Sequence, residues 1–89
     1  MASYLARINV MLKPLVNDPQ GLAVQDGLAN LSFAGIKSVR VGKRIEIRLD
    51  AANDDDASEE VRAMCERLLA NQVIEEFEFE VSAAAAAAS

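Results

Sequence analysis

The chain has 89 residues, of which 52% are hydrophobic and only 4% aromatic, and its formal net charge is −5. A chain this short makes one small domain that buries roughly 60–65% of its unfolded surface, so self-association is a common source of stability. The charge argues against nucleic-acid binding, no apolar run reaches the roughly 18 residues of a membrane span, and no secretory signal begins the chain.

Residues 4–12 alternate in polarity with a period of two, which predicts a β-strand. One face carries only apolar side chains. The other face mixes polar residues with Leu5 and Met11. If that face of the sheet is uncovered, these two residues are candidates for self-association.

Residues 19–31 have the spacing of a helix, because Val24, Leu28 and Leu31 fall on one side. Gly27 weakens the middle of this helix by ~1 kcal/mol relative to alanine. We interpret Gly27 as a residue that permits close packing of the helix on a sheet.

The joint between this strand and this helix is the sequence Asp18-Pro19-Gln20-Gly21. Asp18 is a good N-cap, and Pro19 suits the first helical position, where its missing N–H has little cost. Capping does not require Gln20 or Gly21. All four residues are candidates for an interface. A plain helix cap explains Asp18 and Pro19 at least as well, so Gln20 and Gly21 are the better candidates.

Residues 36–50 predict a hairpin with a two-residue turn at Gly42-Lys43, because period-two apolar residues flank the turn. The turn lies in the most basic part of the chain. Arg40, Gly42 and Lys43 form a second candidate surface, for a phosphate or an acidic partner. A plain polar turn explains the same residues equally well.

Residues 51–57 predict a loop that ends in a helix cap, since Asp56 and Glu59 have capping-box spacing and Ser58 is an alternative cap. The following helix has a strong apolar stripe: Val61, Met64, Cys65, Leu68 and Leu69. Asn71 is a plausible helix stop, and it is also a candidate interface residue.

Residues 73–81 predict the last strand. Val73, Phe77, Phe79 and Val81 are expected on one face, and Glu76, Glu78 and Glu80 on the other. We take residues 1–81 as the domain and the alanine-rich residues 82–89 as an accessory tail.

The predicted order is β-α-β-β-α-β, an α+β fold with an antiparallel sheet and two helices on one face. In the usual strand order of this ferredoxin-like pattern, the first strand lies between the third and the last. The far face of the sheet is then uncovered and charged.

Catalytic chemistry has little support in this composition. The chain has no histidine and one cysteine, Cys65, which falls on an apolar helix stripe and reads as a buried structural thiol. The run Asn53–Asp56 is explained better by a solvated loop than by a metal site. The glutamates of the last strand are explained better by a solvated row of charges than by an acid/base pair. We expect no catalytic residue, no cofactor and no metal in this chain, and a single free thiol favours the cytoplasm.

Three segments in register resemble the PurS family of phosphoribosylformylglycinamidine synthase. They are Val10–Lys13 through Asp18–Gly21 and Ala23–Val24, then Val39–Lys43, then Met64–Asn71 followed by Val73–Glu75. The resemblance covers about residues 4–81, and the alanine tail departs from it.

The resemblance implies a non-catalytic small subunit in de novo purine synthesis. It would dock a glutaminase subunit (PurQ) on a synthetase subunit (PurL) that uses ATP and magnesium, and assist ammonia transfer between them. It also implies a homo-oligomer, a dimer or tetramer, with strands paired across subunits. The alternative from the residues alone is a small dimeric ligand-sensing regulatory domain.

Overall fold

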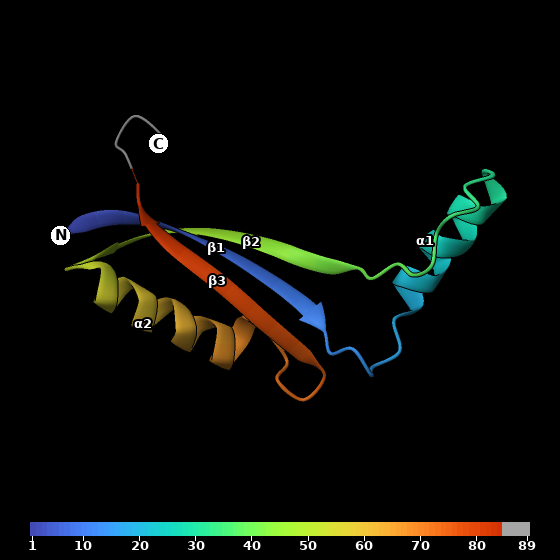
Figure 1. Ribbon diagram of the computed structural model, residues 1–89. Coiled ribbons are helices and arrows are strands. Elements are labelled where there is room, and N and C mark those ends of the chain that lie inside the picture. Colours follow the sequence, from blue (N-terminus) through green and yellow to red (C-terminus); the bar gives the residue numbers. More distant parts are fainter. Residues whose placement is uncertain (85–89) are drawn as a thin grey trace.

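The computed structural model describes residues 1–84 as an antiparallel three-stranded sheet with one helix against it and one helix projecting from its end (Figure 1). The strand order is β2-β1-β3. In chain order the elements are β1 (Ala2–Leu12), α1 (Pro19–Asn30), β2 (Gly42–Ala51), α2 (Asp54–Met64), the π-helical turn η1 (Cys65–Leu69) and β3 (Glu75–Ala83).

The central strand β1 carries the core, as its alternation predicts. Tyr4, Ala6, Ile8 and Val10 are buried on the inner face of the sheet, toward α2. Ile8 lies opposite Ile45 of β2 and Phe79 of β3, so apolar residues of all three strands share that face. The α+β class, the antiparallel sheet and the central position of the first strand are confirmed.

Helix α2 and the first residue of η1 close the inner face with three fully buried residues: Ala57 and Val61 of the helix, and Cys65. The N-cap of α2 is Asn53, whose side chain accepts from the amide of Asp56, so the predicted capping box at Asp56 is wrong. Asp54, Asp55 and Asp56 are instead the first helical turn. Carboxylates are favourable there because the free amide groups give that helix end a partial positive charge.

The helix ends in a π-type turn, in which the amide of Ala70 donates to the carbonyl of Cys65. Asn71 then folds the chain back, because its side-chain oxygen accepts from the amide of Val73 at 3.1 Å. Val73 is 81% exposed and precedes β3, so its predicted place on the inner face of the last strand is wrong. The Asn71 turn postpones the strand to Glu75.

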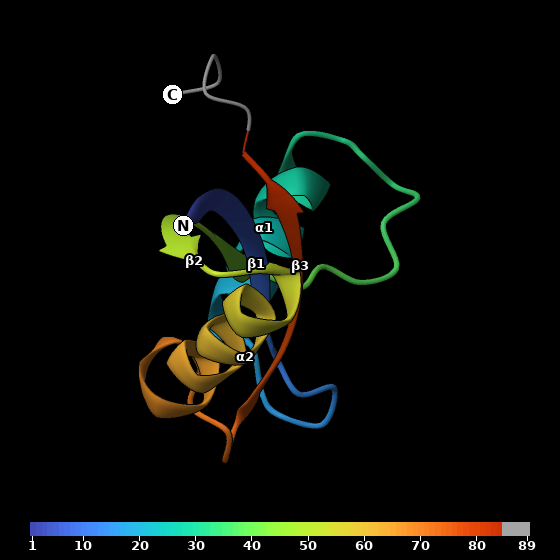
Figure 2. The same ribbon diagram turned by 90° about the vertical axis from the view of Figure 1, so that its left-hand side faces the viewer.

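The prediction of two helices on one face is wrong within the described residues. Helix α1 extends from the far end of the sheet and has no substantial packing contact with the sheet or with α2 (Figures 1 and 2). Nothing lies within 4 Å of a β-carbon built on Gly27, so this glycine does not serve close packing on a sheet. We call residues 19–41, α1 with the chain that returns to β2, the arm.

The arm makes the molecule elongated. The radius of gyration is 16.9 Å, against about 12 Å for a compact chain of this length. A single copy therefore leaves much of its apolar surface unburied.

The predicted hairpin at Gly42-Lys43 is also wrong. Residues 36–41 form no strand in the described chain, and β2 begins at Gly42 and pairs with β1. The physical reason is that Asp18, the N-cap of α1, accepts from the amide of Val41, and Arg40 donates to carbonyls of residues 12–16, as described below. The observed order in residues 1–84 is β-α-β-α-β, one strand fewer than predicted.

The last strand runs to Ala83, two residues beyond the predicted domain boundary, and the amide of Ala84 donates to the carbonyl of Ser3. The rest of the predicted tail, residues 85–89, lies outside the described residues.

Candidate docking surfaces

Asp18 is the centre of the joint between the sheet and the arm. Its carboxylate is buried, and its two oxygens accept from the amides of Gly21 and Val41, each at 2.9 Å. These two hydrogen bonds, with a smaller contribution from the Arg40 guanidinium, hold the pKa of Asp18 below its ordinary value of 3.8. Asp18 is thus the predicted N-cap, and it also binds the chain that leaves the arm.

Arg40 completes the joint from the returning chain. Its guanidinium donates to the carbonyls of Leu12, Lys13 and Val16 at 3.0–3.3 Å, and its Nε lies 3.9 Å from Asp18 Oδ2. A planar guanidinium has enough donors in fixed directions to bind several acceptors at once. The structure therefore uses Arg40 within the chain, whereas the sequence suggested a surface for a partner.

The two glycines predicted at an interface, Gly21 and Gly42, are both required by close contacts within the chain. A β-carbon on Gly21 would lie 2.7 Å from Asp18 Oδ2 and still closer to the carbonyl oxygen of Val39. A β-carbon on Gly42 would lie 2.5 Å from the carbonyl oxygen of Val10 and would overlap the sulfur of Met11. Only glycine permits these close approaches of backbone.

Gln20, Gly42 and Lys43 come together at one shallow hollow of about 300 Å³ beside the joint. The hollow lies where both ends of the arm meet the sheet, and Glu75 of β3 forms its far side. Gln20 and Lys43 are exposed, and they remain candidate interface residues. Pro19 occupies the first helical position as predicted.

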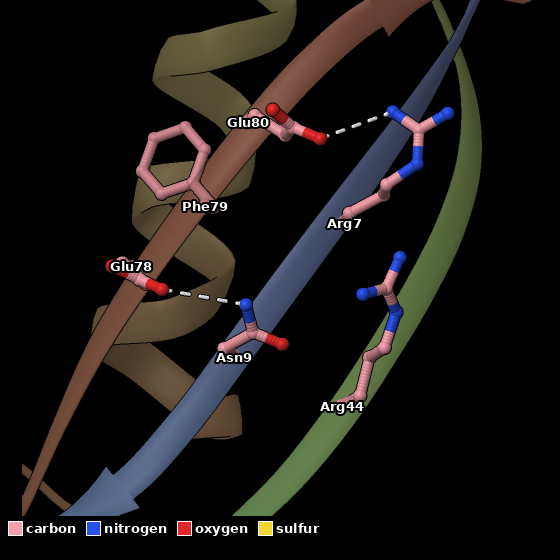
Figure 3. Close-up of a pocket in the computed structure, with 6 residues that line it drawn as sticks. All are labelled: Arg7, Asn9, Arg44, Glu78, Phe79 and Glu80. Carbon is pink, nitrogen blue, oxygen red and sulfur yellow. Dashed lines mark hydrogen bonds and ion pairs between the residues drawn. The ribbon is translucent and has the colours of Figure 1, made fainter.

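The outer face of the sheet, opposite α2, is polar and uncovered (Figure 3). Arg7 of β1 lies 3.4 Å from Glu80 of β3 and also donates to Ser82, and Asn9 donates to Glu78. A hollow of about 310 Å³ separates these pairs from Arg44 on β2. Exposed ion pairs and hydrogen bonds of this kind each contribute little to the stability of the fold. The stability of the fold therefore does not explain why charged residues gather on this face.

Leu5 and Met11 lie on this outer face, as predicted. Each is half-buried, and Met11 lies between Gly42 and Glu76 in the strand register. The face therefore carries two apolar residues within a charged surround, which keeps it a candidate for self-association.

Several apolar side chains of the arm are open to solvent. Leu31 is 70% exposed, and Leu22, Val24, Phe33 and Ile36 are also exposed. On a monomer, exposed apolar surface on this scale indicates an interaction site.

The remaining candidate residues have local roles. Asn71 forms the turn before β3, and its own amide donates to the Glu75 carboxylate at 2.7 Å. Cys65 is fully buried, and burial raises the pKa of its thiol, which confirms the prediction of a structural cysteine. Within residues 1–84, no group of three or more carboxylate, thiol or imidazole side chains is placed to bind a metal. No helix in that range is long and apolar enough to cross a membrane.

Comparisons with known proteins match nearly the whole chain. The family model described as PurS, phosphoribosylformylglycinamidine (FGAM) synthase, matches residues 5–83. The Synechocystis protein named phosphoribosylformylglycinamidine synthase subunit PurS is 49% identical over 91% of this chain and 81% of its own length. The Bacillus subtilis protein of the same name is 42% identical over 88% of this chain and 92% of its own.

The chain belongs to the PurS family. Solved PurS structures share its fold: Methanocaldococcus jannaschii PurS has a TM-score of 0.82 at 36% identity, covering 92% of this chain and 99% of that one. A chain of the structure described as PurLQS from Thermotoga maritima has a TM-score of 0.85 at 33% identity, covering 92% of this chain and all of that one. The elongated arm-and-sheet form is therefore shared with PurS chains determined by experiment.

Proposed function

We propose that this chain is the small, non-catalytic subunit of a phosphoribosylformylglycinamidine synthase complex. In this role it docks a glutaminase subunit, PurQ, on an ATP-dependent synthetase subunit, PurL, and assists ammonia transfer for the conversion of formylglycinamide ribonucleotide to the amidine. The observation that carries the proposal is the match to a chain of the Thermotoga maritima PurLQS structure, which covers 92% of this chain and all of that one.

The chemistry of the described residues agrees with a docking role. The one thiol is buried, and the hollows on the surface are shallow and open. We propose that ATP and magnesium are bound by the synthetase subunit, so that this chain needs no cofactor. The proposal also places the protein in the cytoplasm, the compartment expected from its single free cysteine.

The shape of the chain supports self-association as part of this function. We propose a homodimer in which the arm of each copy packs on the other, with residues 37–41 paired to a strand edge of the second copy. Two observations support it: the arm exposes apolar residues, and β2 and β3 are both edge strands of a three-stranded sheet. A tetramer would add a second contact, for which the outer face is the candidate.

The experiment that tests the function is reconstitution with purified synthetase and glutaminase subunits. Amidine formation is measured with glutamine, and separately with ammonium, in the presence and absence of this chain. We expect glutamine-dependent turnover to require the chain and ammonium-dependent turnover to require it much less, because only the former needs docking and ammonia transfer.

Full glutamine-dependent activity without the chain would contradict the proposal. The ligand-sensing alternative predicts a different result, a metabolite-dependent rise in the melting temperature of the isolated chain. No feature of the described residues specifically favours that alternative.

A further inference from the structure

The direction of the arm relative to the sheet depends on very few contacts. Two segments connect α1 to the sheet: the entering segment, residues 13–18, and the returning segment of the arm, residues 31–41. Helix α1 itself has no substantial packing contact with the other elements (Figure 1). Within residues 1–84, no backbone–backbone hydrogen bond joins these two segments. Side chains must therefore hold them together.

Asp18 and Arg40 supply those links. Asp18 lies on the entering segment and accepts from the amide of Val41, the last residue of the returning segment. Arg40 lies on the returning segment and donates to carbonyls of the entering chain: Leu12, Lys13 and Val16. Each of these bonds fixes one segment against the other, and the ion pair between the two side chains adds to them.

We propose that Asp18 and Arg40 form a positioning latch that sets the angle of the arm to the sheet, and that pairing with a second copy of this chain depends on that angle. The second part rests on the dimer proposed above. Arg40 is then a positioning residue: its side chain binds within its own chain and presents the arm, whereas its backbone lies in the segment proposed to pair with the second copy.

The two halves of the latch differ in burial, which makes the idea testable without unfolding the chain. The Asp18 side chain is 4% exposed, whereas that of Arg40 is 34% exposed. Removal of Arg40 leaves Asp18 with its two amide donors, Gly21 and Val41, so the start of α1 stays capped. An Arg40 variant should therefore free the arm while α1 and the sheet remain folded.

The test measures the distance between spin labels on the arm and on α2, at Asp26→Cys and Glu60→Cys. Both positions are exposed, and the buried Cys65 is shielded from labelling. Labelled chain is diluted into unlabelled chain so that each assembly contains one labelled copy. We expect one narrow distance in the parent chain and a clearly broader distribution in Arg40→Met.

Two further variants sharpen the result. Arg40→Lys should broaden the distances as Arg40→Met does, because one ammonium group lacks the planar fork that binds three carbonyls and a carboxylate together. Lys43→Met removes a neighbouring positive charge that has no place in the latch, and it should leave the distances narrow. Should Arg40→Met fail to fold, Asp18→Asn replaces it, since asparagine remains an N-cap but loses the charge.

An unchanged distribution in Arg40→Met, or full recovery with lysine, would overturn the latch. Dimer association of Arg40→Met and Arg40→Lys, measured by sedimentation, should weaken about tenfold relative to the parent chain, equal to ~1.4 kcal/mol. Broad distances with unchanged association would overturn the second part of the proposal. These measurements use this chain alone, so their failure is distinguishable from failure of the synthase reconstitution.

Discussion

Gly21 and Gly27 lie in the same helix but have opposite surroundings. Gly21 is buried against the backbone of Val39, whereas Gly27 has open space around it. We expect Gly21→Ala to destabilise the chain by about 1–3 kcal/mol through overpacking, and Gly27→Ala to stabilise it by about 0.5–1 kcal/mol through helix propensity. Urea unfolding of the two matched variants measures both effects, and equal responses would show that the contact with Val39 is wrong.

The low pKa of Asp18 predicts an acid-sensitive joint. Because the pKa in the folded chain is lowered from 3.8, the stability contributed by Asp18 is complete above about pH 5 and is lost as pH falls through the folded value. The parent chain should therefore lose more stability than Asp18→Asn between about pH 4 and pH 2. Melting temperatures across that range test this, and parallel curves for the two proteins would contradict it.

Residue-scale prediction succeeded where the interaction is local. The N-cap role of Asp18 depends on an amide only three residues away. The place of Pro19 at the first helical position depends on its own ring. Both could therefore be predicted from the sequence. The second oxygen of Asp18 binds Val41, 23 residues along the chain. No local pattern contains that pairing, and for this reason Arg40 and Gly21 were assigned to an interface rather than to the joint.

The two helices differ in what covers their apolar stripes. In α2 and the turn η1 that follows it, Ala57, Val61 and Cys65 are fully buried on the sheet, whereas Leu68 of the predicted stripe is 83% exposed. In α1, Val24, Leu28 and Leu31 share one side of the helix, yet Val24 and Leu31 remain exposed. The same helical spacing of apolar residues therefore places them in the core in α2 and on an exposed surface in α1.

The stripe of α1 gives a prediction about association. We expect Leu31→Ser to weaken dimer formation markedly, because it removes an exposed apolar side chain from the stripe. Leu22→Ser is the matched control, since nine residues place Leu22 on the opposite side of the helix. Sedimentation equilibrium over a dilution series measures both, and equal effects of the two changes would contradict a role for this stripe.

At the scale of the whole molecule, the outer face of the sheet predicts a second contact between copies. Met11→Lys would place a charge at one of its two apolar positions, and we expect the largest oligomer to dissociate at higher concentration than in the parent chain. Gln72→Lys adds the same charge on an exposed turn and serves as the control. An unchanged mass of Met11→Lys at dilute concentration would exclude this face from self-association.

The sequence by itself determined the three strands and two helices that form, which face of β1 is apolar, and the PurS family resemblance, but it also predicted a strand at residues 36–41 that does not form. These follow from periodicity and from short strings of residues, which are local properties of the chain. Two element boundaries differ from the prediction because of short-range side-chain bonds: the Asn71 turn delays β3, and the Asn53 cap starts α2 earlier.

Only the tertiary structure decided where the arm goes. The predicted hairpin and the predicted packing of α1 on the sheet are both consistent with the local pattern. They fail because Arg40 binds the carbonyls of residues 12–16 and Asp18 binds the amide of Val41. These bonds carry α1 past the end of the sheet and leave residues 36–41 outside it. Hydrogen bonds between residues more than 20 positions apart have no signature in periodicity, so the direction of the arm is known only once the chain is folded.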